Sequence, residues 1–194
     1  MKIIERNKCY TFDNFNINDG NKEAFKHLKK VAEKPSELCN LLVVYGAEGT
    51  GKTHLLKSVE KHLKESTKLK ILYVESAQFI RDYLASKHDI DYINNELLKD
   101  WLVENTDMTF EDIFMDKYYN VDCLIIDDLQ IFKTLYKVQN EFSKVLKHLI
   151  DNNKQVIMSS NKNFCDLEFD NELKNQITEQ GVTVDLYFNG VEGD

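Results

Sequence analysis

The glycine-rich stretch at residues 46–53 holds the residue types that a phosphate-binding loop needs. An apolar run at 41–45 ends at Gly46, and the octet GAEGTGKT fits G-x-x-x-x-G-K-T at every fixed position. Glycines let the main chain approach a ligand, so that successive N–H groups surround phosphate oxygens where a helix begins. In this pattern Lys52 reaches the β- and γ-phosphates and the Thr53 hydroxyl binds Mg²⁺. The alternative is a glycine turn that binds nothing. The predicted phosphate contacts are Gly46, Ala47, Glu48, Gly49, Thr50, Gly51, Lys52 and Thr53.

Two carboxylates follow a second apolar run, in the sequence LIIDD at residues 124–128. In a phosphate-loop protein, Asp127 at the tip of such a strand would hold Mg²⁺. Asp128 would orient or activate the attacking water as a general base. Asn161 follows another apolar run, and from a neighbouring strand its amide would reach the γ-phosphate or the water. The alternatives are an acidic turn for the carboxylates and a turn former for Asn161.

Strand and helix patterns alternate around these residues. Apolar runs predict strands at residues 41–45, 70–75, 121–127, 155–158 and 182–188. Helical spacing predicts helices at 21–33, 52–64, 76–90, 91–103 and 166–180, a short helix through Phe110 and Phe114, and one capped by Thr134 that ends near Asp151. This alternation predicts an α/β fold whose five-stranded parallel sheet carries helices on both faces. We interpret 1–194 as one domain, with a lead-in at 1–20 and an acidic helical insertion at 76–117.

The overall charge argues against a protein that grips DNA by itself. The formal net charge is −8, and residues 82–116 contain ten acidic residues but only two lysines. Such a segment repels phosphates, so direct DNA binding is expected to be weak or absent. No apolar run approaches the roughly 18 residues of a membrane span. The four cysteines have no metal-ligand spacing, so we expect reduced thiols and a cytoplasmic location.

Three motifs together resemble the AAA+ core of the DnaA family, the bacterial replication initiators. They are GAEGTGKTHLL, NVDCLIIDDLQIF and KQVIMSSNKN, and the lead-in YTFDNFNINDGNKEAF is also similar. The resemblance covers about residues 10–188 and implies a three-layer P-loop NTPase that binds ATP and Mg²⁺. His54 and the Asp-Asp-Leu-Gln run are typical of the DnaA and helicase-loader branch, which implies a nucleotide-site role for His54. The resemblance also implies adenine contacts at Ile17 and Asn21, for which a surface-loop role is the alternative.

The chain departs from the family where a catalytic arginine is expected. The family places an arginine finger shortly before the last strand, whereas residues 171–181 (NELKNQITEQG) contain no arginine. Lys174 is the nearest cation, and it lacks the planar fork of a guanidinium. The sequence given also ends without the family's lid and DNA-binding domain. We therefore expect weak ATP hydrolysis by the isolated chain, although a partner could supply the arginine.

Three functions fit these observations. The first is an ATP-binding protein that acts in replication initiation or its regulation through DnaA, a replicative helicase or copies of itself. The second is a nucleotide-independent adaptor, which the intact Lys52, Thr53 and Asp127 argue against. The third is a helicase loader that contacts single-stranded DNA, which the acidic segment argues against.

Overall fold

The computed structural model describes residues 10–87 and 109–187. The predicted helix at 91–103 and residues 88–108 of the predicted insertion lie outside these ranges. Within them, five strands form one sheet in the order β2-β3-β4-β1-β5, and every neighbouring pair is parallel. The strands are β1 (Leu41–Gly46), β2 (Ile71–Glu75), β3 (Cys123–Asp127), β4 (Gln155–Ser160) and β5 (Gly181–Leu186).

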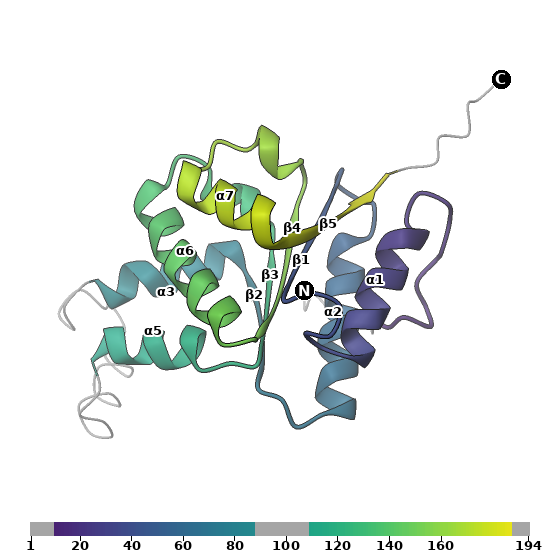
Figure 1. Ribbon diagram of the computed structural model, residues 1–194, viewed down its shortest axis with the longest axis horizontal. Helices are drawn as coiled ribbons and strands as arrows, with labels where there is room; N and C mark the ends of the chain where they lie inside the picture. Colours follow the sequence, from purple (N-terminus) through teal and green to yellow (C-terminus); the bar gives the residue numbers. More distant parts are fainter. Residues whose placement is uncertain (1–9, 88–108, 188–194) are drawn as a thin grey trace, which may run out of the picture.

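Helices cover both faces of this sheet, as the sequence predicts (Figure 1). One face carries α1 (Lys22–Glu33) and α2 (Lys52–Ser66). The other face carries the 3₁₀ turns η2 (Leu129–Phe132) and η3 (Phe164–Asp166) and the helices α3 (Ser76–Ser86), α5 (Phe110–Tyr119), α6 (Tyr136–Asp151) and α7 (Asn171–Gln180). The fold is thus a three-layer α/β sandwich.

The alternation of side chains along each buried strand fills both layers at once. In β3, Leu124 and Ile126 pack beneath the α3, α5, α6 and α7 layer, whereas Cys123 and Ile125 pack beneath α1 and α2. All four side chains are fully buried. A parallel strand covered on both faces reads as a continuous apolar run, which explains why β3 was visible in the sequence.

Strand order brings the functional segments to one edge of the sheet. β4 lies between β1 and β3, and all of these strands run in the same direction. Their carboxyl ends therefore meet, and the segments that follow them are neighbours in space. These segments are the glycine-rich loop at the end of β1, the two carboxylates at the end of β3 and just after it, and Asn161 after β4.

Two local predictions were wrong. Thr134 does not cap α6, which begins at Tyr136 with Leu135 at the N-cap position and without a side-chain cap. The reason is that η2 closes immediately before, with the Leu135 N–H donating to the Phe132 carbonyl, and Thr134 takes a left-handed conformation in that turn. The last helix begins at Asn171 instead of residue 166, because the Asp170 carboxylate accepts the Leu173 N–H and starts it there.

None of the helices in the described ranges is long and apolar enough to cross a membrane. Cys39, Cys123 and Cys165 are free thiols, and Cys9 lies outside the described residues. Burial raises the pKa of the Cys123 thiol, which keeps it protonated inside β3.

Candidate functional site

The loop between β1 and α2 needs its glycines for close approach and for backbone conformation. A Cβ on Gly46 would collide with the main-chain oxygen of Leu186 on β5. Gly51, the N-cap of α2, has a φ of 102°, and a Cβ there would come within 2.7 Å of the Phe15 ring. Gly49 has a φ of 80°. Only glycine therefore fits these close contacts and backbone conformations, and a loop of this kind can offer its main-chain N–H groups to an anion.

Lys52 is buried at the start of α2, with only 6% of its surface exposed. Its Nζ donates to the carbonyl oxygens of Gly46 at 2.6 Å and Ala47 at 2.9 Å. Burial lowers the pKa of Lys52, and the carboxylates of Asp128, Asp127 and Glu48 partly oppose this. A partly desolvated ammonium gains more from a nearby anion than a solvated one does. The lysine therefore favours a negatively charged ligand at the loop.

The Asp127 carboxylate, 2% exposed, collects donors from three neighbouring elements. Its Oδ2 accepts from the Thr53 hydroxyl at 2.7 Å and from the Tyr73 hydroxyl at 2.8 Å. Its Oδ1 accepts from the Ser159 hydroxyl on β4. Burial and the neighbouring Asp127 raise the pKa of Tyr73, which keeps its hydroxyl a donor. A carboxylate and an aliphatic hydroxyl in contact form an oxygen donor set that suits Mg²⁺.

Asp128 and Asn161 lie on adjacent loops, and Gln130 joins them. Asp128 has a φ of 63°, a left-handed conformation that is uncommon for residues other than glycine. Gln130 Nε2 donates to Asp128 Oδ1 at 3.0 Å, and the Asn161 N–H donates to Gln130 Oε1 at 3.1 Å. The buried Oδ1 of Asn161 has no hydrogen-bond partner in the described part of the chain. A buried acceptor without a partner is costly, so this oxygen is suited to receive a ligand or water hydrogen.

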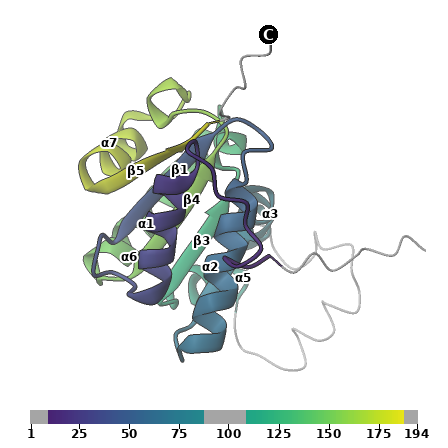
Figure 2. The same ribbon diagram turned by 90° about the vertical axis from the view of Figure 1, so that its right-hand side faces the viewer.

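The lead-in runs along α2 (Figure 2), and His54 on that helix binds it. Its Nε2 lies 3.0 Å from the Thr11 carbonyl oxygen and 2.9 Å from Asn14 Oδ1. Because both oxygens accept, Nε2 carries the proton. The ring also makes an edge contact with Phe15, at 5.1 Å between centroids. His54 thus fixes the segment whose Phe15 lies on Gly51, and its predicted contact with nucleotide stays a prediction.

The two predicted adenine contacts differ in their surroundings. Ile17 is 48% exposed and is available to a ligand. Asn21 is 5% exposed, and its amide accepts the Asn18 N–H at 2.8 Å and donates to the Asn16 carbonyl at 3.0 Å. This arrangement shapes the turn before α1. The adenine contacts at both positions remain predictions.

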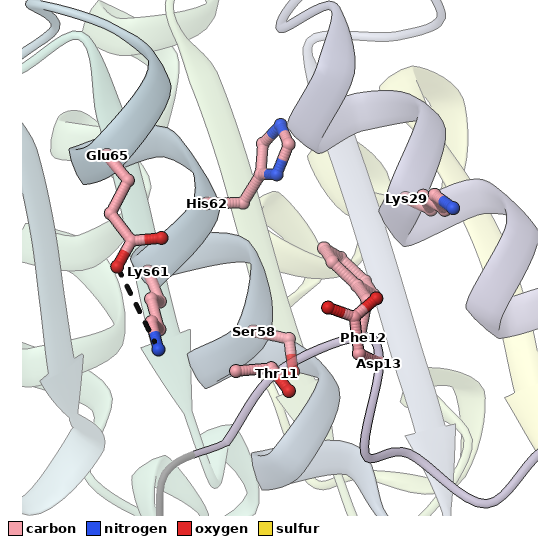
Figure 3. Close-up of a pocket in the computed structure, with 8 residues that line it drawn as sticks. All are labelled: Thr11, Phe12, Asp13, Lys29, Ser58, Lys61, His62 and Glu65. Carbon is pink, nitrogen blue, oxygen red and sulfur yellow. Dashed lines mark ion pairs between the residues drawn. The ribbon is translucent and has the colours of Figure 1, made fainter.

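A cavity of about 330 Å³ lies between the lead-in, α1 and the second half of α2 (Figure 3). None of the residues predicted to bind nucleotide lines it. Its charges are mixed, and Lys61 pairs with Glu65 at 3.8 Å within it. The cavity thus reflects how the lead-in packs on α2. Its lining residues are Thr11, Phe12, Asp13, Lys29, Ser58, Lys61, His62 and Glu65.

Comparison with known protein families decides the wider relationship. The family described as the bacterial DnaA ATPase domain matches residues 6–98 and 83–185. The chain belongs to this family. The DnaA proteins of onion yellows phytoplasma and Campylobacter concisus are 33% and 35% identical to it, each over 93% of the chain. The matched regions are 32% and 37% of those proteins, so the chain spans about a third of the length of its curated DnaA relatives.

Solved DnaA structures share the fold of the chain. AMPPCP-bound DnaA from Aquifex aeolicus matches with a TM-score of 0.75 and 26% identity, over 93% of this chain and 50% of that one. Domain III of Thermotoga maritima DnaA matches with a TM-score of 0.75 and 30% identity, over 93% of this chain and 68% of that one. The DnaC helicase loader, at 17% identity and a TM-score of 0.65 over 91% of this chain and 96% of that one, shares the fold alone. The expected AAA+ core of the DnaA type is thus confirmed.

Within this DnaA-type core, the structure brings most of the predicted site residues together. Five of them lie at or just after the carboxyl ends of three neighbouring strands, namely Lys52, Thr53, Asp127, Asp128 and Asn161. Three contributors were missed by the sequence reasoning, namely Tyr73, Gln130 and Ser159. Gln130 had a signal, because it belongs to the Asp-Asp-Leu-Gln run. Tyr73 and Ser159 had none, because each is an ordinary residue in a short apolar strand.

Proposed function

We propose that this chain binds ATP with Mg²⁺, hydrolyses it slowly when alone, and acts in the initiation of DNA replication or in its regulation. The contact between the Thr53 hydroxyl and the Asp127 carboxylate, beside the buried Lys52, supports this most strongly. These three groups converge on the glycine-rich loop, where Gly46 and Gly51 make close contacts that a side chain would not allow. That a DnaA protein was solved with the ATP analogue AMPPCP also supports a triphosphate ligand.

Each group of the site has a separate role in binding ATP or in its hydrolysis. Main-chain N–H groups of the loop and the Lys52 ammonium bind the phosphate oxygens. Thr53 and Asp127 would hold Mg²⁺, and the ion would supply positive charge to balance that of the phosphates. Asp128 orients the attacking water and accepts its proton, and Asn161 contacts the γ-phosphate or that water.

We propose that the chain acts through protein partners in the cytoplasm. The candidates are a DnaA protein, a replicative helicase and a second copy of the chain. The acidic segment at residues 82–116 favours proteins over nucleic acid, because its charges repel phosphates. The loader DnaC shares the fold, which makes a helicase-related role the alternative within the same process.

Calorimetry with ATP, with and without Mg²⁺, tests the proposed ligand. We expect saturable binding of one ATP per chain and a rise in melting temperature that grows with ATP concentration, because a ligand of the native state stabilises it. GTP at the same concentrations provides the comparison for the base. Absence of both heat and stabilisation would replace this proposal with the nucleotide-independent adaptor.

Replacing Tyr73 with phenylalanine should weaken the apparent Mg²⁺ affinity of the ATP complex. The hydroxyl that orients Asp127 is lost, and loss of such an outer partner costs about tenfold in metal affinity. ATP binding without Mg²⁺ should be unchanged. Titration of Mg²⁺ at fixed ATP measures the effect, with Tyr119→Phe as the control, because the Tyr119 hydroxyl pairs with Glu141 at 3.3 Å, outside the group of donors around Asp127. An equal loss with and without Mg²⁺ would contradict the assignment.

A further inference from the structure

We infer that Gln130 is a positioning residue that sets Asn161 for contact with the γ-phosphate, and so makes the site distinguish ATP from ADP. The inference rests on the proposed ATP binding. It concerns a side chain that makes no phosphate contact in the scheme above and acts only through its neighbours.

Both ends of the Gln130 amide are committed to the two loops that face the predicted phosphate site. Nε2 donates to the Asp128 carboxylate after β3, and Oε1 accepts the main-chain N–H of Asn161 after β4. One amide therefore fixes the distance between the predicted general base and the predicted γ-phosphate contact. If either loop moved relative to the other, one of these two hydrogen bonds would break.

The segment that carries Gln130 is held firmly. It lies in η2 between Leu129 and Phe132, both of which are fully buried in the core. Asp128, two residues before Gln130, has a left-handed conformation, and its N–H donates to Ser159 Oγ at 3.0 Å. Ser159 is itself bonded to Asp127. The hydrogen bonds of Ser159 therefore join the loop after β3 to the end of β4. Those of Gln130 join the same loop to the loop after β4.

The side chain of Asn161 indicates what these hydrogen bonds position. Its Oδ1 is buried and has no hydrogen-bond partner within the described residues, although its main-chain N–H is bonded to Gln130. A fold that fixes the main chain of a residue and leaves its buried amide oxygen unpaired keeps that amide for a ligand. The unpaired Oδ1 of Asn161 is an acceptor, so it would take a hydrogen from the attacking water, and the Nδ2 of the same amide would donate to a γ-phosphate oxygen. ADP has neither the γ-phosphate nor this water, so the fixed amide contributes to ATP binding alone.

Calorimetry with ADP and with AMPPCP, whose γ-phosphate cannot be removed, tests the inference. Gln130→Met keeps the side-chain volume but removes both hydrogen bonds. We expect AMPPCP affinity to fall about tenfold, as for the loss of one weak hydrogen bond to a charged group, here the γ-phosphate, with ADP affinity changed less than about twofold. Gln78→Met is the matched control, because Gln78 also makes two side-chain bonds, to Asp82 and Arg81 on α3. It should change neither affinity.

A second variant separates positioning from a general structural role. If Gln130 acts through Asn161, then Asn161→Ala should lose the same preference for AMPPCP, and adding Gln130→Met to it should cost nothing more. Equal losses of ADP and AMPPCP in Gln130→Met, or additive losses in the double variant, would overturn the inference. So would an unchanged preference in Asn161→Ala, even if Gln130→Met failed to fold. Wild-type chain that binds neither nucleotide would instead overturn the proposed function on which the inference rests.

Discussion

Replacing Lys52 with alanine is expected to weaken Mg²⁺·ATP binding by about 100-fold, which corresponds to the loss of a hydrogen bond to a charged group in a partly desolvated site. Lys52 is 6% exposed, and its ammonium already donates to the carbonyls of Gly46 and Ala47. The same side chain therefore both shapes the loop and supplies its positive charge. Burial lowers the pKa of Lys52, and a bound triphosphate would favour its charged ammonium form.

Calorimetry on folded protein measures this loss, and Lys64→Ala is the matched control. Lys64 lies on the same helix but is 55% exposed and pairs with Glu60 at 2.6 Å, so its removal should change ATP affinity very little. The melting temperature without nucleotide should stay within a few degrees of wild type for both variants. An ATP affinity that survives in Lys52→Ala would mean that the loop does not hold the phosphates.

The phosphate loop and β3 were predictable because their signals are local. Eight consecutive residues specify the loop from Gly46 to Thr53, and the buried strand before Asp127 is a continuous apolar run. The start of α6 was not predictable by the same means. Thr134 has the residue type of a cap, but the closure of η2 at Phe132 decides the local backbone. A packed turn thus overrides a favourable residue type.

The outer parts of the site depend on strand order, which no local pattern states. Tyr73 and Ser159 reach Asp127 only because β2 and β4 both flank β3. Asn161 could be placed near Asp127 only by assuming that its strand neighbours β3, and the pairing of Ile126 with Met158 bears this out. The residues predicted to contact the ligand could therefore be identified from sequence motifs. The residues that orient them could be identified only once the strand order was known.

The purified chain is expected to hydrolyse ATP on the order of 10⁻³ s⁻¹ or more slowly, as phosphate-loop GTPases do without an arginine from a partner. The segment before β5, residues 171–181, has no arginine, and Lys174 cannot replace its planar fork. In the described part of the chain, Arg81 on α3 is the only arginine, and its Nη2 donates to Gln78 at 2.6 Å on its own helix. No arginine of the described residues is therefore placed to stabilise charge on the γ-phosphate in the transition state.

A guanidinium supplied by a partner should raise this rate by about 10³-fold or more, the effect of an arginine finger in phosphoryl transfer. Single-turnover hydrolysis, measured with and without the DnaA protein of the same cell, tests this. The variant of that partner with its finger arginine replaced by alanine is the control. Asp128→Asn in this chain should abolish both the slow and the stimulated reaction, because both use the same base. Hydrolysis near 1 s⁻¹ by the chain alone would show that its own residues stabilise the charge on the γ-phosphate. It would contradict the prediction that a partner must supply an arginine.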